Sequence, residues 1–132
     1  MTKEYSVACD RNKDYILEVI KPLLKENQKV LEIGSGTGQH AVFFAEQIPH
    51  IIWQTADLIY SHNSINAWIE ESKLNNVLKP FVLDANKTDW HEFNFDFAFT
   101  ANTFHIMSFE EVKKIFTGLN KVLNKESFFA VY

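Results

Sequence analysis

The stretch LEIGSGTGQH, residues 31–40, sets three glycines on alternate positions directly behind a short apolar run. Glycine adopts backbone dihedrals that other residues avoid, so Gly34, Gly36 and Gly38 predict a tight turn whose backbone approaches a ligand closely. A helix that starts there turns its free N–H groups toward the same place. One carboxylate, Glu32, lies inside the apolar run. The stretch therefore predicts a strand, a glycine loop and a helix that receive a nucleotide-like group.

Helical and extended patterns alternate on both sides of this stretch. Strands are expected at residues 29–33, 51–57, 80–85, 95–102 and 127–132. Helices are expected at residues 10–24, 41–48, 65–77 and 109–123. Asp10 is the expected N-cap of the first helix, and Pro22 should kink or divide that helix. Ser108 stands three residues before Glu111, which is the spacing of a capping box at the last helix.

This alternation predicts the fold class. Several of the expected strands are apolar on both faces, as in a parallel sheet that helices cover on two sides. Right-handed crossovers then give a doubly wound, Rossmann-like α/β domain with a mainly parallel sheet of about five strands. In such sheets ligands bind beyond the carboxyl ends of the strands, where the strand order reverses. The glycine stretch lies at that kind of end.

Size and charge limit the possible partners. With 132 residues, 46% of them hydrophobic, the chain is expected to form one domain, with an N-terminal helical segment over residues 1–28 and an α/β core over residues 29–132. The net charge of -4 and the scattered lysines predict neither a nucleic-acid nor a membrane partner. No apolar run approaches the roughly 20 residues that cross a bilayer. The single cysteine, Cys9, cannot form a disulfide within the chain, which favours the cytoplasm.

The spacing of the glycines separates two kinds of ligand. The dinucleotide fingerprint G-x-G-x-x-G needs a small residue at position 39, where this chain has Gln39 and follows G-x-G-x-G instead. Glu32 also argues against a dinucleotide, because an acid two residues before the first glycine suits a cationic ligand better than a pyrophosphate. S-adenosylmethionine carries a sulfonium and an ammonium group. A nicotinamide-dependent oxidoreductase is therefore disfavoured.

With these features in place, the sequence resembles the class I S-adenosylmethionine-dependent methyltransferases, whose first motif is similar to VLEIGSGTGQHAVFFA here. Within them it resembles the family called domain of unknown function 938, through RNKDYIL, VLEIGSGTGQH, SINAW, FVLDA and ANTFHI. The resemblance covers nearly the whole chain and implies the Rossmann-like methyltransferase fold. It also implies S-adenosylmethionine as cofactor, S-adenosylhomocysteine as product and a small molecule as methyl acceptor.

The resemblance assigns cofactor contacts to the first two strand ends. Gly34, Gly36 and Gly38 match the loop under the methionine and ribose part of the cofactor. Glu32 matches the acid that holds its amino group. Asp57 ends the second expected strand, where an acid typically accepts hydrogen bonds from the ribose hydroxyls.

The next two strand ends complete the implied cofactor site. Asp84 matches the acid that accepts from the adenine amino group, and Ala85 contributes backbone beside it. Asn102 and Thr103 follow the fourth expected strand, where the methyl-transferring face of the cofactor lies. Acids at strand ends also cap the helices that follow them, so capping remains the alternative for Asp57 and Asp84.

The implied reaction needs alignment of donor and acceptor and exclusion of water more than a catalytic dyad. His105 is the candidate base, beside Asn102, and the alternative is a structural or surface histidine. Arg11 and Asn12 match the amino-terminal family motif and are candidate contacts to the acceptor, with a solvated first helical turn as the alternative. The histidines and Cys9 show no close metal-ligand spacing, so no metal is predicted.

The resemblance breaks off after the fifth expected strand. Class I methyltransferases usually continue to another helix and an antiparallel hairpin, which this sequence lacks. Residues 127–132 are therefore expected at an exposed sheet edge, which either pairs with a second subunit in a homo-oligomer or makes the chain a marginally soluble fragment. The alternative function is a catalytically silent S-adenosylmethionine-binding or scaffold protein that keeps the fold.

Overall fold

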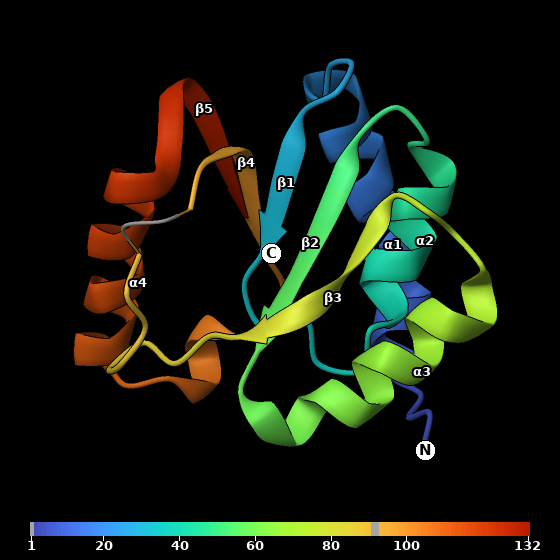
Figure 1. The fold of residues 1–132 in the computed structure, drawn as a ribbon, viewed down its shortest axis with the longest axis horizontal. Coiled ribbons are helices and arrows are strands. Elements are labelled where there is room, and N and C mark those ends of the chain that lie inside the picture. The colour runs from blue at the N-terminus through green and yellow to red at the C-terminus, as the bar shows by residue number, and fades with distance from the viewer. Residues whose placement is uncertain (1, 91–92) are drawn as a thin grey trace.

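The computed structural model describes residues 2–90 and 93–132 and is built around a five-stranded sheet (Figure 1). Its strands are β1 (Lys29–Glu32), β2 (Ile52–Asp57), β3 (Val77–Val82), β4 (Phe95–Thr100) and β5 (Leu123–Val131). The strand order is β3-β2-β1-β4-β5, and all four pairings are parallel. The chain thus winds outward from β1 to β3 and then adds β4 on the other side of β1. The strand order reverses at β1, as the predicted doubly wound class requires.

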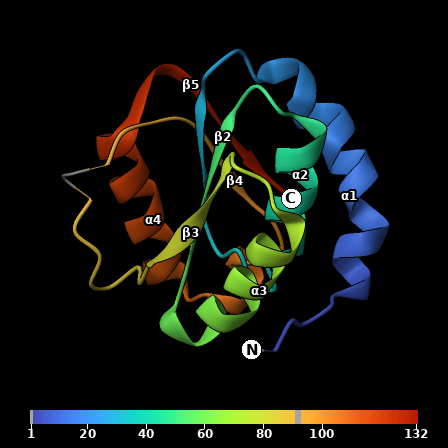
Figure 2. The same ribbon diagram turned by 45° about the vertical axis from the view of Figure 1, so that its right-hand side comes forward.

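Helices cover the two faces of the sheet unequally. One face carries α1 (Val7–Ile20), α2 (Gln39–Gln47) and α3 (His62–Ser72), and we call it the three-helix face (Figures 1 and 2). The other carries α4 (Phe109–Val122), and we call it the one-helix face. Short 3-10 turns lie at Lys21–Leu23, Ile59–Ser61 and Phe104–Ile106. Within the described residues, no helix has the length and apolarity to cross a membrane.

The first helix begins earlier than the sequence predicts. Ser6 is its N-cap, because the Ser6 hydroxyl accepts a hydrogen bond from the Cys9 N–H at 3.2 Å. The prediction that Asp10 caps this helix is therefore wrong, and Asp10 pairs with Lys13 on the helix surface at 2.8 Å instead. The expected segment is divided near Pro22, as predicted, because α1 ends at Ile20 and a 3-10 turn follows it.

Other element boundaries also differ from the prediction, and the third strand runs over Val77–Val82 where residues 80–85 were expected. The third helix ends at Ser72, where Lys73 takes a left-handed φ of 58°, so Val77 opens β3 instead of ending a helix. The Asn76 amide donates to the carbonyls of Ala45 and Ile51 at 2.9 and 3.1 Å, and these contacts anchor the turn between the two elements. The fifth strand follows α4 directly from Leu123, whereas it was predicted from residue 127.

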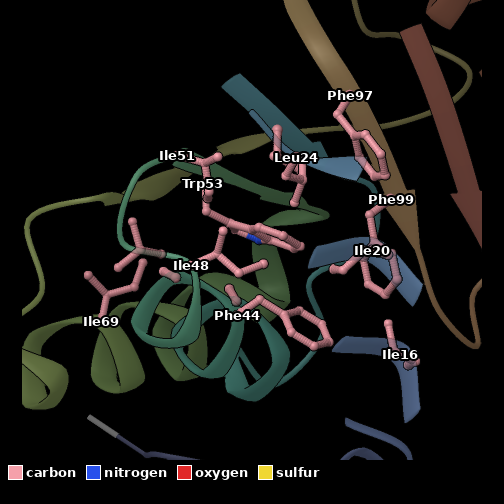
Figure 3. Packing of buried hydrophobic residues seen from close by; sticks show 14 of the residues in the cluster. Ile16, Ile20, Leu24, Phe44, Ile48, Ile51, Trp53, Ile69, Phe97 and Phe99 are labelled. Atoms are coloured by element: carbon pink, nitrogen blue, oxygen red, sulfur yellow. The ribbon is translucent and has the colours of Figure 1, made fainter. Parts of the chain in front are cut away.

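The three-helix face buries an aromatic core. Phe44, Trp53 and Phe99 are fully buried, and their ring centroids lie 5.3 to 5.7 Å apart. Figure 3 shows the Trp53 indole in the middle of this cluster, with Ile20 of α1 and Ile48, the residue that follows α2, beside it. Each such side chain contributes roughly 1.5–3 kcal/mol through burial. This core packs α1, α2 and α3 against the sheet.

Candidate functional site

Two cavities flank the carboxyl end of β1. The larger, which we call the glycine-loop cavity, has a volume of about 530 Å³ and is lined by the start of α1, the glycine loop and the segment after β4. The smaller, which we call the α4 cavity, has a volume of about 170 Å³ and reaches Glu111 and Ile115 of α4. Gly34, Asp57 and Thr103 line both cavities. The two therefore form two chambers of one candidate site, at the point where the strand order reverses.

The three predicted glycines have different surroundings. Gly34 and Gly36 line the glycine-loop cavity with left-handed φ values of 74° and 57°. A Cβ atom on Gly36 would meet no atom within 4 Å, so the backbone there faces open space. A Cβ on Gly38 would lie 2.8 Å from the Cα atom of Ile65 in α3. Gly38 is thus placed for close packing of α2 on α3, and it is absent from the described residues that line the two cavities.

Glu32 is a buried carboxyl group in the wall of the glycine-loop cavity. It is 2% exposed, and its Oε1 atom accepts a hydrogen bond from the Trp53 indole N–H at 3.1 Å. Burial raises the pKa of Glu32 to about 7, although hydrogen bonds from Trp53 and Ser35 act in the opposite direction. A positively charged group in the cavity would favour the ionised form of this acid.

Asp57 links the end of β2 to the glycine loop. Its Oδ2 atom accepts a hydrogen bond from the Gly36 N–H at 2.8 Å, and its Oδ1 atom accepts from the Leu58 N–H at 2.7 Å. The N-cap of the following helix α3 is Ser61, so Asp57 does not cap that helix. Each carboxylate oxygen keeps a further lone pair, and Asp57 lines both cavities.

Asp84 and Ala85 line the α4 cavity, just beyond β3. The Asp84 Oδ1 atom accepts from the Asn86 N–H at 2.9 Å, which makes a local turn and caps no helix. Glu111 faces the same cavity from α4, and hydrogen bonds from Ser108 lower the pKa of its carboxyl group. The sequence identified Glu111 only as a partner in the capping box, which the structure confirms at 3.0 and 3.1 Å.

The three residues predicted after β4 all line the glycine-loop cavity. Asn102 has a left-handed φ of 55°, and its N–H donates to the Tyr132 carbonyl at 3.2 Å. Thr103 extends into both cavities, and its hydroxyl donates to the Ala101 carbonyl at 3.1 Å. His105 lies on the short turn at Phe104–Ile106 and is exposed at the cavity rim.

Arg11 and Asn12, predicted together, separate in the structure. Both lie in the second turn of α1 because the helix begins at Val7. Arg11 is exposed and does not appear among the described residues lining either cavity. Asn12 is 6% exposed, and its Oδ1 atom lies 2.7 Å from the Nε2 atom of His40. The alternative of a solvated helical turn therefore holds for Arg11 and is wrong for Asn12.

Cys9 and His40 are among the residues of the glycine-loop cavity that sequence reasoning missed. His40 is 5% exposed and stacks on Phe44 with centroids 5.2 Å apart, and burial lowers its pKa to about 4. Its Nδ1 atom lies 3.8 Å from the Cys9 sulfur atom. The available signal for His40 was its position two residues after the last glycine, within the same strand-to-helix connection.

A metal site does not emerge from the described residues, among which no three His, Cys, Asp or Glu side chains are grouped to hold an ion. His91, one of the five histidines that were weighed as ligands, lies outside the described residues. The candidate site is thus described by carboxylates, glycine backbone and neutral polar groups.

Several solved structures are similar to this chain, and the descriptions of SibL and of the Aquifex aeolicus protein name methyltransferases. PKMT2 from Rickettsia typhi, in complex with AdoHcy, is 31% identical over 81% of this chain and 21% of its own, with a TM-score of 0.69. The S-adenosylmethionine-dependent methyltransferase SibL, in its apo form, is 19% identical over 94% of this chain and 36% of its own, with a TM-score of 0.81. An S-adenosylmethionine-dependent methyltransferase from Aquifex aeolicus is 23% identical over 91% of this chain and 62% of its own, with a TM-score of 0.75.

These similarities confirm the Rossmann-like methyltransferase fold. The chain spans about a fifth of the length of PKMT2 and about a third of that of SibL. Residues 3–132 match the protein family described as "Protein of unknown function (DUF938)". Because this match leaves out only the first two residues, the chain belongs to the DUF938 family.

Proposed function

We propose that this protein binds S-adenosylmethionine across the two chambers and transfers its methyl group to a small molecule. The observation that carries the proposal is the charge of the site. Glu32, Asp57, Asp84 and Glu111 line the two cavities, and the described lining residues include no lysine or arginine. A cavity with this charge favours a cationic ligand. The buried Glu32 carboxyl group, whose pKa is raised to about 7, gains most from such a partner.

The residues present fit the parts of this cofactor. Glu32 would receive the ammonium group in the glycine-loop cavity, beside the exposed backbone of Gly34 and Gly36. Asp57 lies between the chambers and has lone pairs free for the ribose hydroxyls. The α4 cavity adds apolar side chains such as Ile115 to the Asp84 carboxylate, which suits a flat base with an exocyclic amino group. When bound, S-adenosylmethionine supplies an activated methyl group on a positively charged sulfur atom.

The acceptor would enter the part of the glycine-loop cavity that α1 and the segment after β4 enclose. Asn102, Thr103 and the rim residue His105 remain the candidate contacts to the reacting groups, with His105 as the candidate base. Asn12 contacts His40, which lines the glycine-loop cavity. Among the described contacts, Arg11 has none to a residue that lines this cavity. The AdoHcy complex of PKMT2, at 31% identity, supports the cofactor assignment.

We further propose that residues 1–132 act as one domain in the reducing cytoplasm, since the single cysteine has no partner for a disulfide within the chain.

Calorimetric titration with S-adenosylmethionine and S-adenosylhomocysteine tests the proposal. Both should bind, and Asp57→Ala should weaken binding at least about tenfold, because it removes a charge-assisted contact to the ligand and the support of the Gly36 N–H. The control is Asp14→Ala, which changes the net charge equally at an exposed position on α1. A folded sample that gives no heat with either ligand would refute cofactor binding. Binding without methyl transfer across a panel of acceptors would assign the silent scaffold function instead.

We also propose that the protein forms a homo-oligomer through β5. This strand lies at the edge of the sheet, where Phe128 and Val131 are each 52% exposed. An apolar groove of about 230 Å³ continues from Val131 and Tyr132 to Tyr15 of α1. Unpaired strand edges beside apolar surface favour pairing with another chain. Light scattering after size-exclusion chromatography should give a molar mass that is a multiple of 15.4 kDa. The Phe128→Lys variant should have a molar mass closer to that of a single chain. A monomer at all concentrations would contradict this.

A further inference from the structure

The sequence stretch SINAW, residues 64–68, lies in α3, beside the start of the chain (Figures 1 and 2), and none of these described residues lines either cavity. Two of its side chains contact the backbone of one residue near the N-terminus. The Glu4 N–H donates to the Ser64 hydroxyl at 2.9 Å, and the Trp68 indole N–H donates to the Glu4 carbonyl at 2.7 Å. The stretch thus provides partners for both polar groups of the Glu4 backbone.

The Ser64 hydroxyl also reaches the glycine loop. It donates to the Thr37 carbonyl at 2.7 Å while it accepts from the Glu4 N–H. Ser64 is 4% exposed, and a buried N–H or carbonyl group left without a partner is costly. The Ser64 side chain therefore fixes the start of the chain relative to the glycine loop.

Gln39, the first residue of α2, makes a second link of the same kind. Its Oε1 atom accepts from the Ser6 N–H at 2.9 Å, and its own N–H donates to the Thr37 hydroxyl at 3.1 Å. Gln39 is 5% exposed. Ser6 and Thr37, at the two ends of this link, both line the glycine-loop cavity. A ligand in this cavity would therefore lie against both of them.

Residues 2–6, which we call the N-terminal strap, also have a contact at the surface of α3. The Lys3 Nζ atom lies 2.9 Å from a carboxylate oxygen of Glu71 and 3.8 Å from the centroid of a Trp68 ring. Glu71 is exposed, so this ion pair contributes little. The hydrogen bonds to Ser64, Trp68 and Gln39 are thus the main attachment of the N-terminal strap.

We propose that Ser64, Trp68 and Gln39 are positioning residues for cofactor binding, because they fix the N-terminal strap across the glycine loop. The attached strap adds Ser6 to the cavity wall, and the same hydrogen bonds hold the loop backbone at Thr37, so the loop is preorganised for the ligand. By reciprocity, a ligand that binds the ordered loop also favours attachment of the strap. This coupling rests on the proposed function, since the ligand is taken to be the cofactor.

Hydrogen exchange of single backbone amides, followed by NMR, tests the attachment without ligand. Ser64→Ala should speed exchange of the Glu4 N–H at least about tenfold, because that N–H loses its acceptor. Trp68→Phe keeps an aromatic ring and removes the indole N–H, so it should speed the same exchange to a smaller degree. The matched control is Ser72→Ala, whose hydroxyl donates to the Ile69 carbonyl of the same helix, and it should leave Glu4 unchanged.

Calorimetric titration with S-adenosylhomocysteine tests the coupling. Ser64→Ala should weaken binding at least about fivefold, although its side chain lines neither cavity. Trp68→Phe should weaken binding less, in the same order as its effect on exchange. Ser72→Ala should bind as tightly as the wild type.

Exchange measured with saturating S-adenosylhomocysteine tests the reciprocal effect, which a purely structural role of Ser64 would not produce. The ligand should slow exchange of the Glu4 and Ser6 N–H groups in the wild type. The control is the Lys25 N–H, which also donates to a side chain, that of Gln28, and belongs to neither cavity. Its exchange should not change.

Equal exchange at Glu4 in the wild type and Ser64→Ala would overturn the attachment. If the wild type and both α3 variants, Ser64→Ala and Trp68→Phe, bind S-adenosylhomocysteine equally tightly, or if the ligand leaves exchange in the strap unchanged, the coupling is wrong and the proposed function stands. If the folded wild type binds no S-adenosylhomocysteine, the proposed function fails and the coupling with it, and titration of the wild type alone identifies this case.

Discussion

The burial of ionisable groups differs between the two faces of the sheet. On the three-helix face, Glu32 contacts Trp53 and His40 stacks on Phe44, and both groups are almost fully buried. On the one-helix face, Asp84 and Glu111 lie at a cavity rim and hydrogen-bond to nearby backbone N–H groups. Packing between the sheet and the three helices buries Glu32 and His40, whereas Asp84 and Glu111 on the side of α4 are only partly buried. The depth of helical cover thus decides which groups have strongly shifted pKa values.

The largest expected effect comes from removing the centre of the three-helix core. Trp53→Ala should lower the free energy of unfolding by about 5 kcal/mol, because it leaves a cavity and takes the indole N–H away from Glu32. Leu119→Ala, at a buried position on the one-helix face, should cost about 3 kcal/mol. Urea unfolding measures both. Equal costs would mean that the two faces contribute alike and would break the comparison.

The next largest effect is on the pH dependence of the free energy of unfolding, to which Glu32 and His40 contribute in opposite directions. Between pH 4.5 and 7 the folded protein keeps a proton on Glu32 that the unfolded chain has released, so stability falls as pH rises. Between pH 4 and 6.5 the unfolded chain binds a proton that buried His40 does not, so stability rises with pH. Each shift corresponds to about 3 kcal/mol over its range. The two contributions should nearly cancel where the ranges overlap.

Single substitutions separate these two contributions. Glu32→Gln should leave a free energy of unfolding that rises with pH from 4 to 6.5, and His40→Gln should leave one that falls from pH 4.5 to 7. Urea unfolding at several pH values measures both slopes. The control is Asp14→Asn, at an exposed carboxylate on α1, whose curve should follow that of the wild type. If the curve of Glu32→Gln also runs parallel to the wild type, Glu32 titrates normally and is not buried as described.

Much of the fold was predictable because it depends on local patterns. Strand and helix periodicities located all five strands and all four helices, and the box of Ser108 and Glu111 located the start of α4. The predicted end of the third helix failed because it depends on distant contacts. Asn76 ends the turn before β3 by donating to carbonyls of α2 and of its connection to β2, and a spacing rule along the sequence does not contain such a contact.

In the candidate site too, the location of most residues was predictable from local patterns, whereas the role of some depends on tertiary packing. Glu32, Gly34, Gly36, Asp57, Asp84 and the residues after β4 were predicted because each lies at or just beyond the end of a strand, and parallel strands end at one edge of the sheet. Gly38 belongs to the same motif, yet its Cα faces Ile65 of α3 closely enough to exclude a side chain. The role of each motif position depends on what packs against it.

The sequence by itself determined the α/β alternation, the glycine turn and the acids at the strand ends, because these are properties of neighbouring residues. Only the tertiary structure decided the pKa of Glu32, which depends on the depth of burial beside Trp53. It also brought Cys9 and Asn12 to His40 across 31 and 28 positions of the chain. Burial and contacts between distant segments arise when helices pack on the sheet, so periodicity along the chain does not encode them.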